Sequence, residues 1–280
     1  MTYNARIRQL ERIWARADIR VQGVDDEGRA FDNQVEGHLQ LIRPDRVALS
    51  IAKLGEVYFY LGSNSERYWW LDLSGSPRTA RVGTHGGSGA ADVLSRDLPL
   101  QPLDLIELLG VTPLPVDLGS SNQGDGASLS DVGARAPARS HGLTFLTADA
   151  RTIVVAVQSA GRRQWLYLDA STLEPKRIQL AGGATRDLID ATLTDYLPVR
   201  VRENPAASPR MASVVTVRLP SQQTEVRFRF NSMENRGESM KNAPFDLERL
   251  LTSYRVDSIV DLDAGRRSGR PQTQPGGSAP

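Results

Sequence analysis

The sequence predicts a mainly β (α+β) fold, with one curved antiparallel sheet of about eleven strands and helices covering its concave face. Apolar residues alternate with polar ones over many short segments, which is typical of strands with one buried face. Turn residues such as those at 62–65 separate the segments and favour hairpins. No βαβ alternation is visible, so a parallel doubly wound sheet is not expected.

The stretch 47–73 carries the clearest pattern and predicts three consecutive strands. The third strand, 68–73, is apolar on both faces, because Tyr68 and Trp70 alternate with Trp69, Leu71 and Leu73. Something is therefore expected to cover each side of it. The first two strands are expected to turn one apolar face inward, with Val47, Leu49, Ile51, Val57, Phe59 and Leu61 on that face.

Three segments predict helices, at 4–17, 99–110 and 244–254. The first has Ile7, Leu10, Ile13 and Trp14 at helical spacing. The second has a proline near its start and Gly110 after its end, where a glycine commonly terminates a helix. Each is expected to pack inside the curve of the sheet.

Strand-like segments continue to residue 230. They lie at 19–23, 35–41, 78–82, 143–147, 152–158, 164–169, 176–180, 187–196, 199–202, 214–219 and 225–230. The last would place Val226, Phe228 and Phe230 on the inner face. A single domain is expected over 1–262. A flexible insertion is expected at about 118–142, which is rich in Ser, Gly, Ala and Pro with few large apolar residues. A disordered tail is expected at 263–280, which shows no periodicity.

Composition and charge exclude several function classes. The 34 basic and 33 acidic residues leave a net charge of +1, so nucleic acid is not an expected partner. Arg218, Arg227 and Arg229 are interpreted as the polar face of alternating strands. The absence of cysteine excludes disulfides and thiolate metal sites. No apolar run approaches the length of a membrane span. Without a signal peptide, the protein is either cytosolic or has lost an export segment.

Catalytic motifs are not found. The glycine-rich run at 83–89 lacks the lysine of a phosphate-binding loop, and His85 has no acidic partner at a fixed spacing. Three separated histidines, His38, His85 and His141, do not have the spacing of a zinc site. No enzyme activity, cofactor or metal is therefore expected, although a site assembled from scattered residues remains an alternative.

The inner apolar face suggests lipid binding. If the helices cover it incompletely, an acyl chain could complete the burial, at about 0.8 kcal/mol for each CH₂ group. The candidate ligand-binding residues are Val47, Leu49, Ile51, Val57, Phe59, Leu61, Val226, Phe228 and Phe230. A charge placed on that face, as in Phe59→Asp, is expected to abolish folding or binding. A filled core is the alternative, and it would suit a protein-interaction or sensor module.

The segment 5–75 resembles the LolA/LolB-like superfamily of lipoprotein carriers and receptors. The similarity is carried by Gly37, Leu39, Leu41, Pro44 and Arg46, followed by Leu54, Gly55, Phe59, Leu61, Gly62, Ser63 and Asn64. The resemblance implies a half-barrel of about eleven antiparallel strands closed by helices, located in the periplasm or outer membrane. It also implies that the concave face binds a lipid or an acylated protein without catalysis. The membrane surface is a further candidate partner.

Overall fold

The computed structural model describes residues 3–25, 27–85, 100–115, 142–149, 151–159, 162–182, 188–202, 204 and 208–264. The predicted insertion at 118–142 lies outside the described residues except at its last residue. The predicted tail at 263–280 lies outside them except at its first two residues. The expected flexibility of both segments stays a prediction.

Fifteen strands form one sheet within the described residues. They are β1 (Arg12–Val24), β2 (Ala30–Ile42), β3 (Arg46–Lys53), β4 (Glu56–Ser63), β5 (Arg67–Asp72), β6 (Thr79–Thr84), β7 (Gly142–Asp149), β8 (Thr152–Ser159), β9 (Arg162–Asp169), β10 (Pro175–Gly182), β11 (Ile189–Pro198), β12 (Arg200–Val201), β13 (Arg210–Leu219), β14 (Thr224–Asn235) and β15 (Ser258–Asp261). The helices are α1 (Tyr3–Arg8), α3 (Pro102–Leu108) and α4 (Leu247–Ser253), with 3₁₀ turns η1 (Pro220–Gln222), η2 (Gly237–Ser239) and η3 (Ala243–Phe245).

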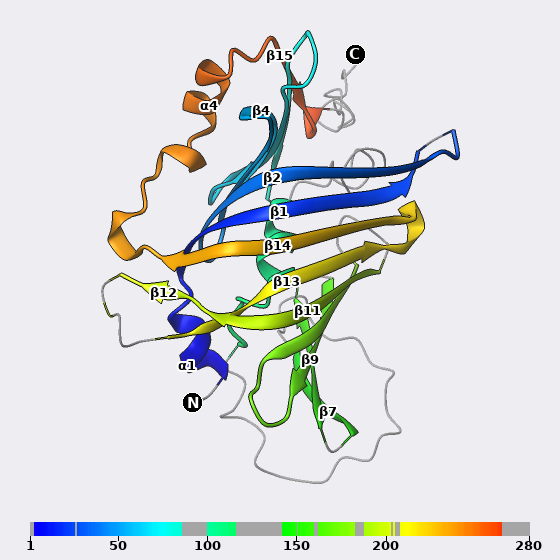
Figure 1. Ribbon diagram of the computed structural model, residues 1–280, viewed down its shortest axis with the longest axis vertical. Helices are drawn as coiled ribbons and strands as arrows, with labels where there is room; N and C mark the ends of the chain where they lie inside the picture. Colours follow the sequence, from blue (N-terminus) through cyan, green and yellow to red (C-terminus); the bar gives the residue numbers. More distant parts are fainter. Residues whose placement is uncertain are drawn as a thin grey trace, which may run out of the picture.

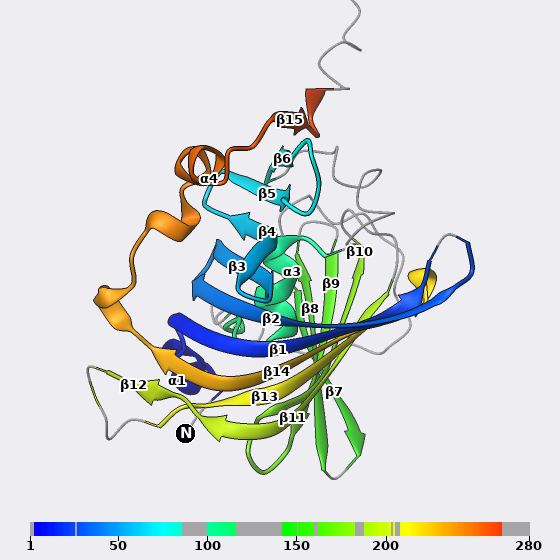
Figure 2. The same cartoon turned by 45° about the horizontal axis from the view of Figure 1, so that its top comes forward.

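The strands follow the order β15-β6-β5-β4-β3-β2-β1-β14-β13-β11-β10-β9-β8-β7, and β12 pairs with β14 beside this path. Pairing is antiparallel except where β15 joins β6 and β12 joins β14. Figures 1 and 2 show that the sheet curves strongly, and Figure 2 shows β3–β5 and β8–β10 on opposite sides of α3. The predicted curved antiparallel sheet is thus confirmed, whereas the expected count of about eleven strands is too low.

The first predicted helix is wrong over most of its length. Within the predicted segment 4–17, only the part that belongs to α1 is helical, and the chain from Arg12 onward is strand β1. Alternate residues of β1, including Ile13, Ala15 and Ala17, are buried in the inner core. Because β1 lies between β2 and β14, both of its edges form ladders of backbone hydrogen bonds. A helix in this position would leave the facing edges of β2 and β14 without partners.

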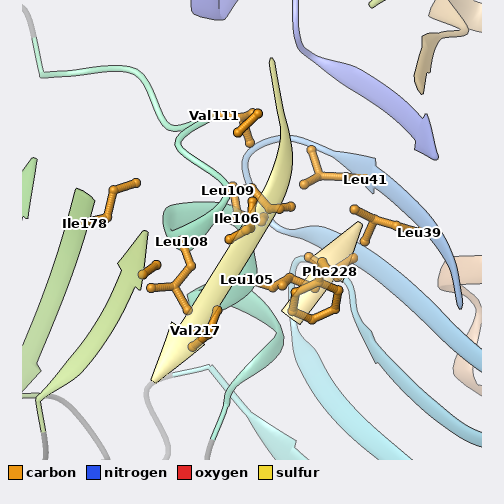
Figure 3. Close-up of a cluster of buried hydrophobic side chains, with 14 of the residues drawn as sticks. Leu39, Leu41, Leu105, Ile106, Leu108, Leu109, Val111, Ile178, Val217 and Phe228 are labelled. Carbon is orange, nitrogen blue, oxygen red and sulfur yellow. The ribbon is translucent and has the colours of Figure 1, made fainter. Parts of the chain in front are cut away.

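The inner core lies between the concave face of the sheet and α3. The helix contacts β3, β4 and β10, so it spans the curve from one side to the other. Its residues Leu105, Leu108 and Leu109 are buried together with Leu39 and Phe228 from the sheet (Figure 3). The second predicted helix is therefore present and lies within the concavity.

A second, outer core lies on the opposite face of β2–β6. Trp69 and Leu71 of β5 pack there against Leu250 of α4 and Phe245 of η3. Tyr68, their neighbour in sequence, belongs to the inner core, so the expectation that both faces of this strand are covered is confirmed. The third predicted helix is present as η3 and α4. It packs on the outer face, however, and not inside the curve as expected.

Candidate ligand site on the concave face

Most of the predicted ligand-binding residues are completely packed. Six of the nine are at most 3% exposed and lie in the inner core; they are Val47, Leu49, Leu61, Val226, Phe228 and Phe230. Ile51 and Phe59 are half-buried and pack against the same core. These eight residues therefore share the concave face, as the alternation predicted. Whether they contact a ligand stays a prediction.

Val57 does not lie on the concave face. Ile51 pairs with Phe59 but Ala52 pairs with Val57, so Tyr58 is an extra residue in β4. Such a bulge reverses the alternation of side chains on one side of it. Val57 consequently packs against the outer core and Tyr58 against the inner one. The bulge could not be predicted from the sequence, because Val57, Phe59 and Leu61 continue the alternation without interruption.

A cavity of about 300 Å³ lies between α3 and the turn that joins β2 to β3. Its volume falls at the lower end of the range of small-molecule sites. Four apolar residues contribute to its wall, namely Pro44, Leu103, Ile106 and Pro113. Three charged residues, Glu11, Arg43 and Glu107, also line it. The cavity therefore combines a largely apolar wall with a few ionisable groups.

The positions of α3 and the segment after it are fixed by hydrogen bonds. At the start of α3, the Asp104 carboxylate accepts a hydrogen bond of 3.0 Å from the backbone nitrogen of Gln101. At its end, Gly110 has a φ of +67°, which reverses the chain as predicted. Beyond it, the Tyr3 hydroxyl donates to the Thr112 carbonyl at 2.9 Å, so α1 holds the segment that forms one cavity wall.

Arg43 links the turn between β2 and β3 to α1. Its guanidinium donates to the carbonyls of Ile7 at 2.9 Å and Leu10 at 3.2 Å. Ile7 lies in the last turn of α1 and Leu10 lies two residues beyond its end, where backbone carbonyls lack partners within the helix. Partial burial lowers the pKa of Arg43 from its ordinary value, and nearby Glu11 opposes that shift. Arg43 thus closes one side of the cavity with a guanidinium that already has two acceptors.

Glu107 and Asp104 of α3 meet Arg162 of β9. Arg162 Nη2 forms a hydrogen-bonded ion pair with Asp104 Oδ1, and its Nε lies 3.7 Å from Glu107 Oε2. Burial raises the pKa of Glu107 to about 7, while Arg162 lowers it and Asp104 raises it further. This cluster could not be predicted from the sequence, because Glu107 and Arg162 are 55 positions apart and only the fold brings them together.

Metal sites and membrane-spanning helices are both absent from the described part of the chain. No group of three or more His, Asp or Glu residues is placed to hold a metal ion there. No helix within those residues is long and apolar enough to cross a lipid bilayer.

Solved structures share this arrangement at low sequence identity. A DUF1329 family protein from Desulfovibrio piger aligns with a TM-score of 0.52 and 11% identity, over 89% of this chain and 97% of the other. A LolA superfamily protein from Nitrosomonas europaea aligns with a TM-score of 0.50 and 10% identity, over 89% of this chain and 99% of the other. The chain has a LolA-like fold. The resemblance seen in residues 5–75 is thus confirmed for the fold.

A putative outer membrane lipoprotein-sorting protein domain from Vibrio parahaemolyticus is also similar, with a TM-score of 0.49 and 11% identity over 89% of this chain and 94% of the other. No protein-family model and no curated protein matches the sequence. The LolA-like fold rests on the alignments with the Desulfovibrio piger and Nitrosomonas europaea structures.

Proposed function

We propose that this LolA-like protein is a non-enzymatic protein of the periplasm or outer membrane that binds an acyl chain of a lipid or lipid-modified protein. The cavity of about 300 Å³ beside α3 is the observation that carries the proposal. Its wall includes Leu103 and Ile106 from the helix and Pro44 from the facing turn. An acyl chain needs apolar surface and no set of polar partners, and this wall supplies such surface.

The cavity forms one part of the proposed site. The other part is the apolar concave face, and α3 controls access to it. Leu105 and Leu108 of α3 are buried in the same inner core as the six candidate residues, so a long chain would enter between α3 and the sheet only when α3 moves. Each CH₂ group removed from water contributes about 0.8 kcal/mol, which offsets part of the lost packing. We therefore place the first carbons of the chain in the cavity and the remainder between α3 and the sheet.

Filling the cavity tests this proposal. Leu103→Trp inserts a larger side chain into the cavity wall and should weaken binding of the uncharged probe N-phenyl-1-naphthylamine about tenfold or more. Leu54→Trp is the matched control, because Leu54 lies in the β3–β4 turn and is 97% exposed. Native mass spectrometry of the purified wild-type protein looks for an acyl ligand in parallel. The proposal fails if no acyl compound co-purifies or titrates, or if both variants bind as the wild type does.

A protein-interaction or sensor module is the second candidate. It is favoured by the continuous packing of α3 onto the concave face, where Leu108 and Val47 have no exposed surface. In that case the inner core is filled and α3 does not move. Hydrogen exchange of the amides at 103–109 separates the two functions. Faster exchange in the presence of an acyl ligand supports the carrier-like function, and unchanged exchange supports the filled module.

A further inference from the structure

Glu107 presents a carboxylate to the cavity from the same face of α3 as Leu103 and Ile106. The three residues have the i, i+3 and i+4 spacing of one helix face, and all three line the cavity. The Glu107 side chain is 25% exposed. A carboxylate in a largely apolar wall is unfavourable when ionised, unless a cation compensates it closely.

The nearest cation is already engaged by another acid. Arg162 makes its short hydrogen bond to Asp104, which is itself almost completely buried. The 3.7 Å between Arg162 Nε and Glu107 Oε2 is too long for a hydrogen bond. Glu107 is therefore only weakly compensated by Arg162, in agreement with burial as the largest cause of its raised pKa.

The other charges at the cavity do not compensate Glu107 either. Glu11, from the segment before β1, has the same sign. Arg43, from the β2–β3 turn, directs Nε and Nη2 to the backbone carbonyls of Leu10 and Ile7. With two carboxylates and one engaged guanidinium, the cavity is a poor site for an anionic head group.

We propose that the cavity accepts one uncharged acyl chain, linked as an ester or amide, and that Glu107 must be protonated for the chain to enter. This inference rests on the function proposed above and specifies its ligand. A chain that fills the cavity displaces water from Glu107, so the ionised form becomes more costly in the complex. Glu107 then takes up a proton when the acyl chain binds. Protonation of Glu107 raises the affinity for the chain, and the bound chain raises the pKa of Glu107.

The sign of the pH effect follows from this linkage. The ligand-free protein holds the proton on Glu107 up to a pKa of about 7, and the complex holds it to a higher pH. Affinity is therefore full below about pH 6 and falls as the pH rises through 7. Between about pH 6 and pH 8.5 the expected loss is about 5- to 30-fold, depending on how far the ligand raises the pKa.

The experiment measures the dissociation constant of N-phenyl-1-naphthylamine at about pH 6, 7 and 8.5. The wild type should lose affinity over this range, whereas Glu107→Gln should bind at every pH as the wild type does at the lowest. Glu248→Gln, on α4 at the outer face, is the matched control and should keep the wild-type pH profile. A wild-type profile that is flat, or one that persists in Glu107→Gln, overturns the inference and leaves the proposed function standing.

Competition with natural head groups tests the ligand class. 1-Monolauroylglycerol should displace the probe at lower concentration than laurate, since laurate carries a negative charge. A synthetic lipopeptide with a diacylglyceryl cysteine forms a parallel arm, and its affinity relative to the monoglyceride assigns the source as acylated protein or lipid. Tighter binding of laurate than of either ester contradicts the inference. Absence of binding by every compound at every pH overturns the inference together with the proposed function.

A ligand-independent measurement shows whether Glu107 titrates as inferred. Its folded-state pKa of about 7 lies above the ordinary 4.5, so the unfolded chain releases the proton first. The contribution of Glu107 to stability is thus lost as the pH rises from about 4.5 to 7. Thermal unfolding midpoints should fall less over this window in Glu107→Gln than in the wild type. Identical falls would contradict the inference even if the probe binds.

Discussion

Two glycines in the sheet lie directly beneath aromatic side chains of the paired strand β5. A Cβ atom at Gly62 would be 2.4 Å from Trp69 Nε1, and one at Gly83 would be 2.4 Å from Tyr68 Cζ. Trp69 packs in the outer core and Tyr68 in the inner one. Glycine at these two positions thus gives β5 room to hold large rings on both of its faces.

Gly62→Ala is expected to lower the free energy of unfolding by about 1–3 kcal/mol, because the added methyl group overlaps a completely buried indole ring. Urea unfolding followed by circular dichroism measures the change. Gly75→Ala is the control, since a Cβ atom there meets nothing within 4 Å. Equal stability of the two variants would show that Trp69 does not lie against Gly62.

Strand β1 shows what sequence pattern could not resolve at the scale of an element. Ile7, Ile13 and Trp14 have helical spacing, yet the inward face of β1 is completed by two small residues, Ala15 and Ala17. Alanine is a weak hydrophobic signal and a strong helix former, so local propensity favoured the wrong element. Pairing with β2 and β14, which comes from residues far away in sequence, decided the outcome.

The candidate site was predictable only in part for a similar reason. Alternation placed eight residues on the concave face, because each strand has a period of two. The bulge at Tyr58 and the approach of Arg162 to Glu107 depend on contacts between strands or between strand and helix, which alternation does not encode. Sequence likewise predicted that α3 exists, but not how completely it fills the curve.

Shortening a side chain of α3 tests the role of this helix in the inner core. Leu108→Ala should lower the free energy of unfolding by about 2–5 kcal/mol, because the Leu108 side chain, at the end of α3, is completely buried in the inner core. Leu251→Ala on α4 is the matched control and should have a smaller effect, since Leu251 is only half-buried. Chemical unfolding of both variants gives the comparison. A larger loss in Leu251→Ala would mean that α3 is a dispensable cover.

At the scale of the whole molecule, strands from the two ends of the chain share one sheet. β1 pairs with β14, which joins the first six strands to the strands that follow α3. The inner core includes residues from both groups, such as Leu39 and Val217. The described strands therefore form one continuous sheet, and the single domain expected over 1–262 stays a prediction.

One cooperative unfolding transition is the expected result. Circular dichroism of the strands and fluorescence of the four tryptophans, which include Trp69 and Trp70, should give superimposable thermal curves, with calorimetric and van't Hoff enthalpies in agreement. Because these two indoles lie in different cores, their combined signal reports on both faces of the sheet. Two resolved transitions would contradict the expectation and divide the chain into separately folding parts.

The packing of α4 on the outer face makes the two sides of the concavity mechanically unequal. Among the described residues, the outer core draws side chains from β2–β6 and none from β8–β11. Strands clamped on both faces resist bending, whereas those supported on one face deform at lower cost. If the concavity widens to admit a larger ligand, the strands that move would consequently be β8–β10, where Arg162 forms an ion pair with Asp104 of α3. Strands β3–β5 would keep their positions.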